Sequence, residues 1–135
     1  ADSRHAYLLE GENLLQGLDA DLSAADPSFA AERVRRYGEV ARLLIDTGLI
    51  VVSTSKTFGI NYQRMAEMIR TLVQPAPAIA VHMSRAGEEP PPNTDLHFAG
   101  PQDFDAAARQ ILEELKRRGV LIQPSGTKST IQYSI

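Results

Sequence analysis

The chain has 135 residues, 43% of them hydrophobic, with a formal net charge of −3 and no cysteine. This length and composition suit one soluble domain of roughly 100 to 200 residues with a hydrophobic core. The small negative charge supplies no basic field for nucleic acid, so we expect no nucleic-acid partner. The lack of cysteine excludes disulfides, thiolate zinc sites and cysteine nucleophiles, and it fits a reducing cytoplasm.

The chain shows no signal for membrane targeting. Its first residues, Ala1-Asp2-Ser3-Arg4-His5, lack the apolar stretch of a signal peptide. No run approaches the roughly 20 apolar residues needed to cross a bilayer. We therefore expect a cytoplasmic protein without a membrane partner.

Short apolar strands alternate with amphipathic helices. The patterns predict a strand at 7–9, a short helix at 12–18, a long helix from Pro27 to Gly48, a strand at 49–52, a helix at 61–73, strands at 78–81 and 96–98, and a helix at 104–118. In the long helix, Val34, Tyr37 and Ala41 share the core face, whereas Arg33 and Arg36 are expected to face away. The order of elements predicts an α/β domain of three layers with a parallel sheet.

Two further segments complete this scheme. The interval 84–94 contains Pro90-Pro91-Pro92 and is expected to be a surface connection. The end of the chain, 131–135, alternates apolar and polar residues. This pattern suits an extra C-terminal edge strand, or a disordered end if no partner strand receives it.

The first candidate site is the pair Glu10 and Glu12, which follows the first predicted strand. Strand ends in open parallel sheets border the crevice in which ligands bind. Two carboxylates there can hold a magnesium ion through water or take a proton from a hydroxyl. Alternatively, Glu12 is an acid in the first turn of a helix, where the helix dipole favours it.

The second candidate is Ser53-Thr54-Ser55-Lys56-Thr57-Phe58-Gly59, between the most apolar strand and a helix. Unpaired N–H groups at a helix start, together with the hydroxyls and ammonium of Ser55, Lys56 and Thr57, can bind a phosphate or sulfate. The alternative is a helix-capping hydroxyl beside a solvated lysine.

Two stretches together resemble the adenylylsulfate kinase family. The run Leu8-Leu9-Glu10-Gly11-Glu12-Asn13 matches a strand that ends in Asp-Gly-Asp-Asn in the family, and 34–41, Val-Arg-Arg-Tyr-Gly-Glu-Val-Ala, matches its Ile-Arg-Arg-Ile-Gly-Glu-Val-Ala helix. The resemblance implies a P-loop kinase type of fold over 1–121, with 122–135 as a tail or edge strand. It also implies that Glu10 and Glu12 are catalytic, that Asn13, Arg35 and Ser55 contact substrate, and that Mg²⁺ with ATP serves as cofactor if a complete site is assembled.

The chain departs from the family at several substrate contacts. Leu15 stands where the family has an arginine that holds the anionic substrate, and no leucine can replace that charged donor. Asp19 replaces an asparagine and is expected to add negative charge there. The interval 84–94 is too short for the family's basic lid. Lys56 stands in place of a proline.

The phosphate loop is the largest departure. No Gly-x-x-x-x-Gly-Lys-Ser/Thr motif occurs in the 135 residues, and only six residues precede Tyr7, so we expect the first strand and phosphate loop to be missing. Ser125-Gly126-Thr127-Lys128-Ser129-Thr130 approaches the motif but lacks its first glycine, and no long helix follows it.

These observations favour a degenerate adenylylsulfate kinase-like domain related to sulfate activation. Such a domain would be inactive by itself and would act as a nucleotide-binding, regulatory or structural module. Its expected ligand is an adenine nucleotide or an adenylylsulfate-like molecule, and a protein partner or homo-oligomer is also expected. The alternatives are a fragment of an authentic kinase, or other chemistry on the same scaffold. The three histidines, His5, His82 and His97, lack the spacing of metal ligands, so we expect no protein metal site and hydrogen-bonded structural roles for the latter two.

Overall fold

The computed structural model describes residues 5–54, 58, 60–101, 103–120 and 132–134. In chain order the elements are β1 (Ala6–Leu9), α1 (Glu12–Leu15), α2 (Phe29–Asp46), β2 (Ile50–Ser53), α3 (Tyr62–Val73), β3 (Ala78–Ser84), β4 (Leu96–Ala99), α4 (Phe104–Arg117) and β5 (Gln132–Ser134). The predicted alternation of strands and helices is confirmed. The first short helix ends earlier than expected, and β3 runs three residues further.

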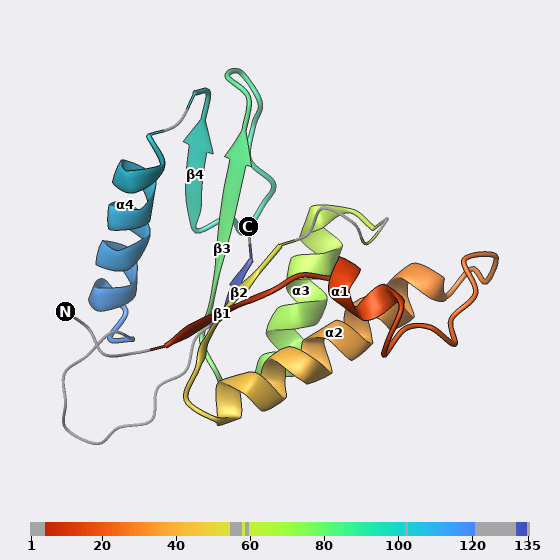
Figure 1. Ribbon diagram of the computed structural model, residues 1–135. Coiled ribbons are helices and arrows are strands. Elements are labelled where there is room, and N and C mark those ends of the chain that lie inside the picture. Colours follow the sequence, from red (N-terminus) through yellow and green to blue (C-terminus); the bar gives the residue numbers. More distant parts are fainter. Residues whose placement is uncertain (1–4, 55–57, 59, 102, 121–131, 135) are drawn as a thin grey trace.

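All strand pairs are parallel, and the strand order is β1-β2-β5-β3-β4. The predicted C-terminal strand exists, but its expected position at an edge is wrong. β5 lies between β2 and β3, and Tyr133 is in register with Val52 on one side and with Ile79 on the other. The sheet separates two helical layers: α2 and α3 lie on one side and α4 lies on the other (Figure 1). The α/β fold of three layers is thus confirmed.

The larger core lies between the sheet and the pair α2 and α3. Apolar residues at helical spacing on α2 and α3 meet Leu9 and Val51 of the sheet. Gly38 allows the two helices to approach closely, because a Cβ at this position would lie 2.5 Å from Leu72 Cδ1. Gly48, with a φ of +96°, follows α2 as expected for a glycine that ends a helix.

The second core lies under α4. Ile79, Val81 and Phe98 of the sheet pack against Ala107 and Leu115 of that helix. Beyond them, β1, β2 and α4 border an apolar cavity of about 260 Å³, lined by Ala6, Ile50, Val52, Ala108, Ile111, Leu112 and Leu115. The sheet therefore has apolar contacts on both faces, as parallel sheets require.

Asp95, directly before β4, joins three elements. Its carboxylate accepts the Ala80 N–H at 2.7 Å and pairs with Arg70 of α3 at 2.5 Å and with Arg118, after α4, at 2.9 Å. These contacts connect the helical layers on opposite sides of the sheet near its β4 edge.

The start of α2 differs from the prediction. Ser28 is the N-cap residue, and Pro27 lies before the helix rather than at its first position. The reason is local: the Asp26 carboxylate accepts both the N–H and the hydroxyl of Ser28 at 2.8 Å, which forms a turn before the helix. Among the described residues, no helix combines the length and apolar character that a membrane crossing needs.

Candidate functional site

The two predicted catalytic carboxylates lie at the carboxyl end of β1. Glu10 follows the strand directly and is half-buried, whereas Glu12 begins α1 and is exposed. Asn13 lies on the same turn, and its N–H donates to the Glu10 carbonyl at 3.1 Å. β1 pairs with β2 in the register Leu9 to Ser53, so Glu10 and Thr54 leave neighbouring strands at the same edge of the sheet. The structure therefore brings Glu10, Glu12 and Asn13 together.

Two side chains of α2 hold this turn in place through hydrogen bonds to its backbone. The Tyr37 hydroxyl, fully buried, donates to the Leu9 carbonyl at 2.5 Å. Arg33 Nη2 donates to the Gly11 carbonyl at 3.4 Å. The two bonds hold the backbone on either side of Glu10, so the position of its carboxylate depends on α2.

The prediction that Arg33 faces away from the core is wrong. Its side chain is 4% exposed and its Nε lies 3.6 Å from the carboxylate of Asp19, whose side chain is fully buried. The guanidinium also lies over two aromatic rings, 4.9 Å from the centre of Phe58 and 5.5 Å from that of Phe29. Asp19 was expected to add negative charge at the site, and the Arg33 cation offsets that charge.

Phe58 packs directly on the turn that carries the two glutamates. A Cβ at Gly11 would lie 2.5 Å from Phe58 Cζ, so only glycine lets the ring approach. The same ring meets Tyr37 edge to face at a centroid distance of 5.0 Å. Gly11, which separates the two glutamates, is therefore required by packing in this structure.

Burial and charge at this turn act on Tyr37. Its pKa is raised to about 12, mainly by desolvation and in smaller part by the negative charges of Glu10 and Glu12, while hydrogen bonds with the Ser53 side chain and the Thr54 backbone oppose the shift. Tyr37 therefore keeps its proton and serves as a hydrogen-bond donor to β1 at neutral pH.

Arg35 does not join the glutamates. It lies on the exposed side of α2 and pairs with Glu32 through two bonds of 2.8 and 2.7 Å. Arg36 contacts both Glu32 and Asp21, with its Nη1 at 2.5 Å from Asp21 Oδ1. The two arginines hold the pKa of Glu32 at about 2. An anion would therefore have to compete with carboxylates for Arg35.

Three other predicted contacts, Ser55, Lys56 and Thr57, lie outside the described residues. Thr54, which directly follows β2 and precedes these three residues, is described and is half-buried. The assignment of these three residues as substrate contacts stays a prediction.

The donor set fits magnesium in one respect. Glu10 and Glu12 offer carboxylate oxygens, the ligands that Mg²⁺ prefers, and Mg²⁺ commonly takes one or two carboxylates together with waters and substrate phosphates. Within the described ranges, no group of three or more histidine, aspartate or glutamate side chains could hold an ion alone. The site thus suits an ion that arrives with a phosphorylated ligand.

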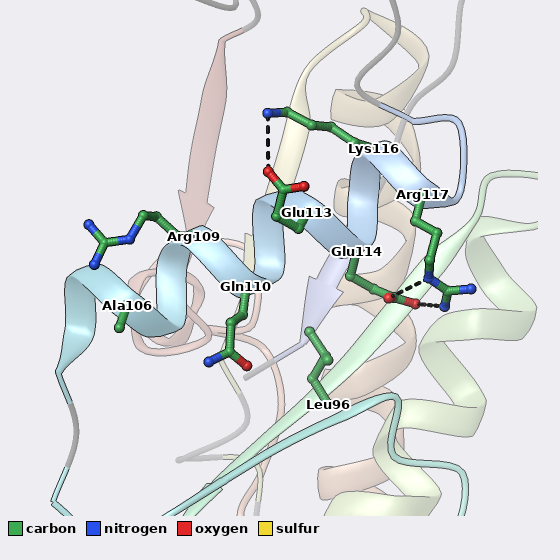
Figure 2. A pocket seen from close by; sticks show the side chains of 8 residues that line it. All are labelled: Leu96, Ala106, Arg109, Gln110, Glu113, Glu114, Lys116 and Arg117. Carbon is green, nitrogen blue, oxygen red and sulfur yellow. Dashed lines mark hydrogen bonds and ion pairs between the residues drawn. The ribbon is translucent and has the colours of Figure 1, made fainter.

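A second hollow, of about 730 Å³, runs along α4 and is lined by none of the predicted site residues. Figure 2 shows two ion pairs along the helix: Glu113 with Lys116, at 3.4 Å, and Glu114 with Arg117, whose Nε lies at 2.9 Å. Such neighbouring pairs on an exposed helix are ordinary surface features. They make this hollow a weaker candidate than the turn at Glu10.

Sequence reasoning missed the buried ion pair of Arg33 and Asp19. The signal for Arg33 was present, because it stands four residues before Tyr37, and Ala41 and Ile45 follow at the same spacing on the buried face of α2. Its charge led to the wrong prediction. Asp19 carries no such signal, since it lies in a turn without periodicity.

The sequence is similar to those of known proteins. Residues 1–90 match the sequence profile of the adenylylsulphate kinase family. The adenylyl-sulfate kinase of Aeromonas hydrophila subsp. hydrophila is 41% identical over 73 residues, which are 54% of this chain and 35% of the relative. Those of Erwinia tasmaniensis and Vibrio cholerae serotype O1 are 28% identical over 145 residues and 29% identical over 147 residues.

The two longer matches cover 86% and 87% of this chain and 70% and 66% of the respective relatives. The chain thus spans between 35% and 70% of the length of these three curated relatives. The family profile covers two thirds of the chain. It includes α2 and the turn from Glu10 to Asn13, called the Glu10 turn below. The chain belongs to the adenylylsulfate kinase family.

Proposed function

We propose that this chain is a degenerate adenylylsulfate kinase-like domain related to sulfate activation, inactive by itself, which binds an adenine nucleotide or an adenylylsulfate-like ligand. Two observations together support the proposal. The carboxylates of Glu10 and Glu12 stand at the carboxyl end of β1, but the 135 residues contain no glycine-rich phosphate loop. Phosphoryl transfer depends on positioning and charge neutralisation, and the loop would supply much of both.

In this proposal the adenylylated ligand binds at the Glu10 turn. A ribose hydroxyl can donate to the carboxylate of Glu10 or Glu12, and the Asn13 amide adds a donor and an acceptor. Bound Mg²⁺ would supply neutralisation of phosphate charge. Tyr37 and Arg33 would act indirectly, since their bonds to Leu9 and Gly11 fix the backbone that carries both carboxylates.

The anion-binding part is weaker than the family resemblance implies. Leu15 offers no charge, and Arg35 is already paired with Glu32. Ser55, Lys56 and Thr57 are the remaining contacts we assign to the phosphate or sulfate group. We therefore propose a regulatory or structural module in the cytoplasm, acting beside another sulfate-activating component or as a homo-oligomer.

A second candidate is a fragment of an authentic ATP-dependent adenylylsulfate kinase whose phosphate loop lies outside these residues. The partial coverage of its relatives favours this candidate. Sequencing the gene on both sides of codons 1–135 discriminates the two: a Gly-x-x-x-x-Gly-Lys-Ser/Thr motif in the same reading frame supports the enzyme.

The direct test is calorimetric titration of the purified chain with ATP, adenylylsulfate and phosphoadenylyl sulfate, with and without Mg²⁺. We expect saturable binding of at least one adenylylated ligand and no turnover of ATP. Glu10→Gln and Glu12→Gln should each weaken Mg²⁺-dependent binding, whereas Glu89→Gln, in the exposed connection before β4, should not. Consumption of ATP at an ordinary kinase rate would refute the proposed inactivity, and silence toward all three ligands would refute the binding.

A further inference from the structure

Two histidines face each other across neighbouring strands, away from the Glu10 turn. His82 of β3 and His97 of β4 are in register, and both are half-buried. Val81, directly before His82, and Phe98, directly after His97, belong to the core under α4. Because successive side chains of a strand point to opposite faces, both imidazoles lie on the other face of the sheet. Their Nδ1 atoms are 3.0 Å apart.

The two imidazole rings contact each other. They are nearly parallel, with an interplanar angle of 15°, but their centres are 5.1 Å apart. With the two Nδ1 atoms at 3.0 Å, one nitrogen must carry the proton and the other must accept it. A single proton therefore sits between two nitrogen lone pairs, and a cation could take its place.

The spacing is close to what a metal ion requires. Two imidazole nitrogens that each bind a tetrahedral zinc ion at 2.0–2.1 Å are about 3.3 Å apart, a few tenths of an ångström more than the observed separation. Small rotations of the two rings would direct both lone pairs toward one point. β4 is the last strand of the described sheet, and both histidines are only half-buried, so water and ions can reach the pair.

The surroundings suit a nitrogen-ligated cation. The Tyr62 ring lies 5.7 Å from His82, and its hydroxyl donates to the Val81 carbonyl at 3.2 Å, which gives the site one aromatic wall. In the described part of the chain no third histidine, aspartate or glutamate joins the pair, so water would complete the coordination. Imidazole donors select zinc, copper and nickel, whereas magnesium prefers oxygen.

We propose that His82 and His97 form a two-histidine binding site for a late first-row divalent cation, of which Zn²⁺ is the probe. The site is independent of the proposed nucleotide function, because it uses no residue of the Glu10 turn. With two protein ligands and water in the remaining positions, it is an open site that exchanges its ion, unlike a closed structural zinc centre.

The test is a calorimetric titration of the full chain with ZnCl₂ near neutral pH, alongside NMR of the histidine side chains. We expect one saturable site and shifted ring signals of two of the three histidines. His82→Ala and His97→Ala should each weaken binding by roughly tenfold or more, since each removes half of the protein ligands. His5→Ala, which removes an exposed histidine, is the matched control and should bind as the unaltered chain does.

A readout of stability keeps the proposal testable if a variant is poorly folded. Zinc that binds only the folded state should raise the thermal midpoint of the unaltered chain and of His5→Ala, but not those of His82→Asn and His97→Asn. MgCl₂ at the same concentration should leave all of them unchanged. Zinc binding that survives both substitutions, or a lack of saturable binding to the unaltered chain, would overturn the proposal.

Discussion

At the scale of single residues, the pair Arg33 and Asp19 is the most costly feature near the candidate site. Both side chains are removed from water, and each leaves an uncompensated charge if the other is deleted. We predict that Arg33→Ala lowers the free energy of unfolding by about 3 kcal/mol, as measured by urea denaturation. Arg42→Ala, which removes an exposed pair with Glu39, should change it by less than about 0.5 kcal/mol.

A compensating double variant sharpens this prediction. Asp19→Leu combined with Arg33→Met removes both charges and keeps much of the volume, so it should recover most of the lost stability. If the double variant is no more stable than Arg33→Ala, the loss comes from packing against Phe29 and Phe58 rather than from the unpaired carboxylate.

Tyr37 gives a second prediction, on pH. Burial raises its pKa to about 12 in the folded state, whereas an unfolded tyrosine titrates near 10. The folded chain thus keeps a proton that the unfolded chain releases, so stability is complete below pH 10 and is lost as the pH rises from about 10 to about 12. The free energy of unfolding should fall across this interval by roughly 2–3 kcal/mol.

Tyr37→Phe is the control for this titration. It removes the ionisable hydroxyl, and also the bond to the Leu9 carbonyl, so the comparison uses the slope of stability against pH and not its absolute value. The slope between pH 10 and 12 should be shallower in Tyr37→Phe, with a residual part from Tyr62, whose pKa is also about 12. Equal slopes in both proteins would contradict the assignment to Tyr37.

The residue scale also shows where sequence reasoning succeeds and fails. Glu10, Glu12 and Asn13 were placed together because a strand end and its following turn are local in the chain. Arg33 was misplaced because its burial depends on Asp19, which lies 14 positions earlier, and on Phe58, which lies 25 positions later. The helical spacing of Arg33 indicated a buried position, but the residues that make burial of its charge possible are distant in sequence.

At the scale of elements, the contact between α2 and α3 depends on Gly38. A Cβ at this position would lie 2.5 Å from Leu72 Cδ1 and 3.1 Å from Leu72 Cβ. Overpacking of this kind costs about 1–3 kcal/mol, which exceeds the helix propensity of up to about 1 kcal/mol that alanine adds. Gly38→Ala should therefore destabilise the chain by about 1 kcal/mol in thermal or urea unfolding.

Two comparisons test the cause. In a Leu72→Ala background, where the clashing atoms are gone, Gly38→Ala should be neutral or stabilising. Gly17→Ala has no atom within 4 Å of the new Cβ and should be close to neutral. A similar loss in all three contexts would mean that the close approach of the helices is not the reason.

Most elements could be predicted from the sequence, because they depend on local periodicity. The apolar spacing in α2 and α3 and the continuous apolar run of β2 each gave the right element within a few residues. The start of α2 was misjudged because the Asp26 carboxylate binds Ser28, two residues on, rather than capping the helix. His82 and His97 meet only through the β3–β4 register, which no spacing along the chain reveals.

At the scale of the whole molecule, the sheet is assembled from distant parts of the chain. The alternation of residues 131–135 suggested an edge strand, since strands inside parallel sheets are usually continuously apolar. The structure places β5 in the middle, between β2 and β3. The pattern of apolar and polar residues within a strand indicates which of its faces are covered. The order of strands in the sheet depends on the connections between them along the whole chain, so the central position of β5 was not predicted.

The central position of β5 leads to the last prediction. β5 is the only strand that pairs with both halves of the described sheet, β1-β2 and β3-β4. A proline at Tyr133 would remove a backbone N–H from the middle of the ladder, a position in which proline is essentially not found. Tyr133→Pro should therefore weaken hydrogen-exchange protection in β2 and in β3 together, whereas Glu89→Pro, in the exposed connection already rich in proline, should weaken neither. Protection lost in only one of the two strands would mean that β5 pairs on one side alone, as an edge strand does. Loss of protection in both strands would show that β5 joins the β1-β2 pair, which carries Glu10 at its end, to the β3-β4 pair, which carries the two histidines.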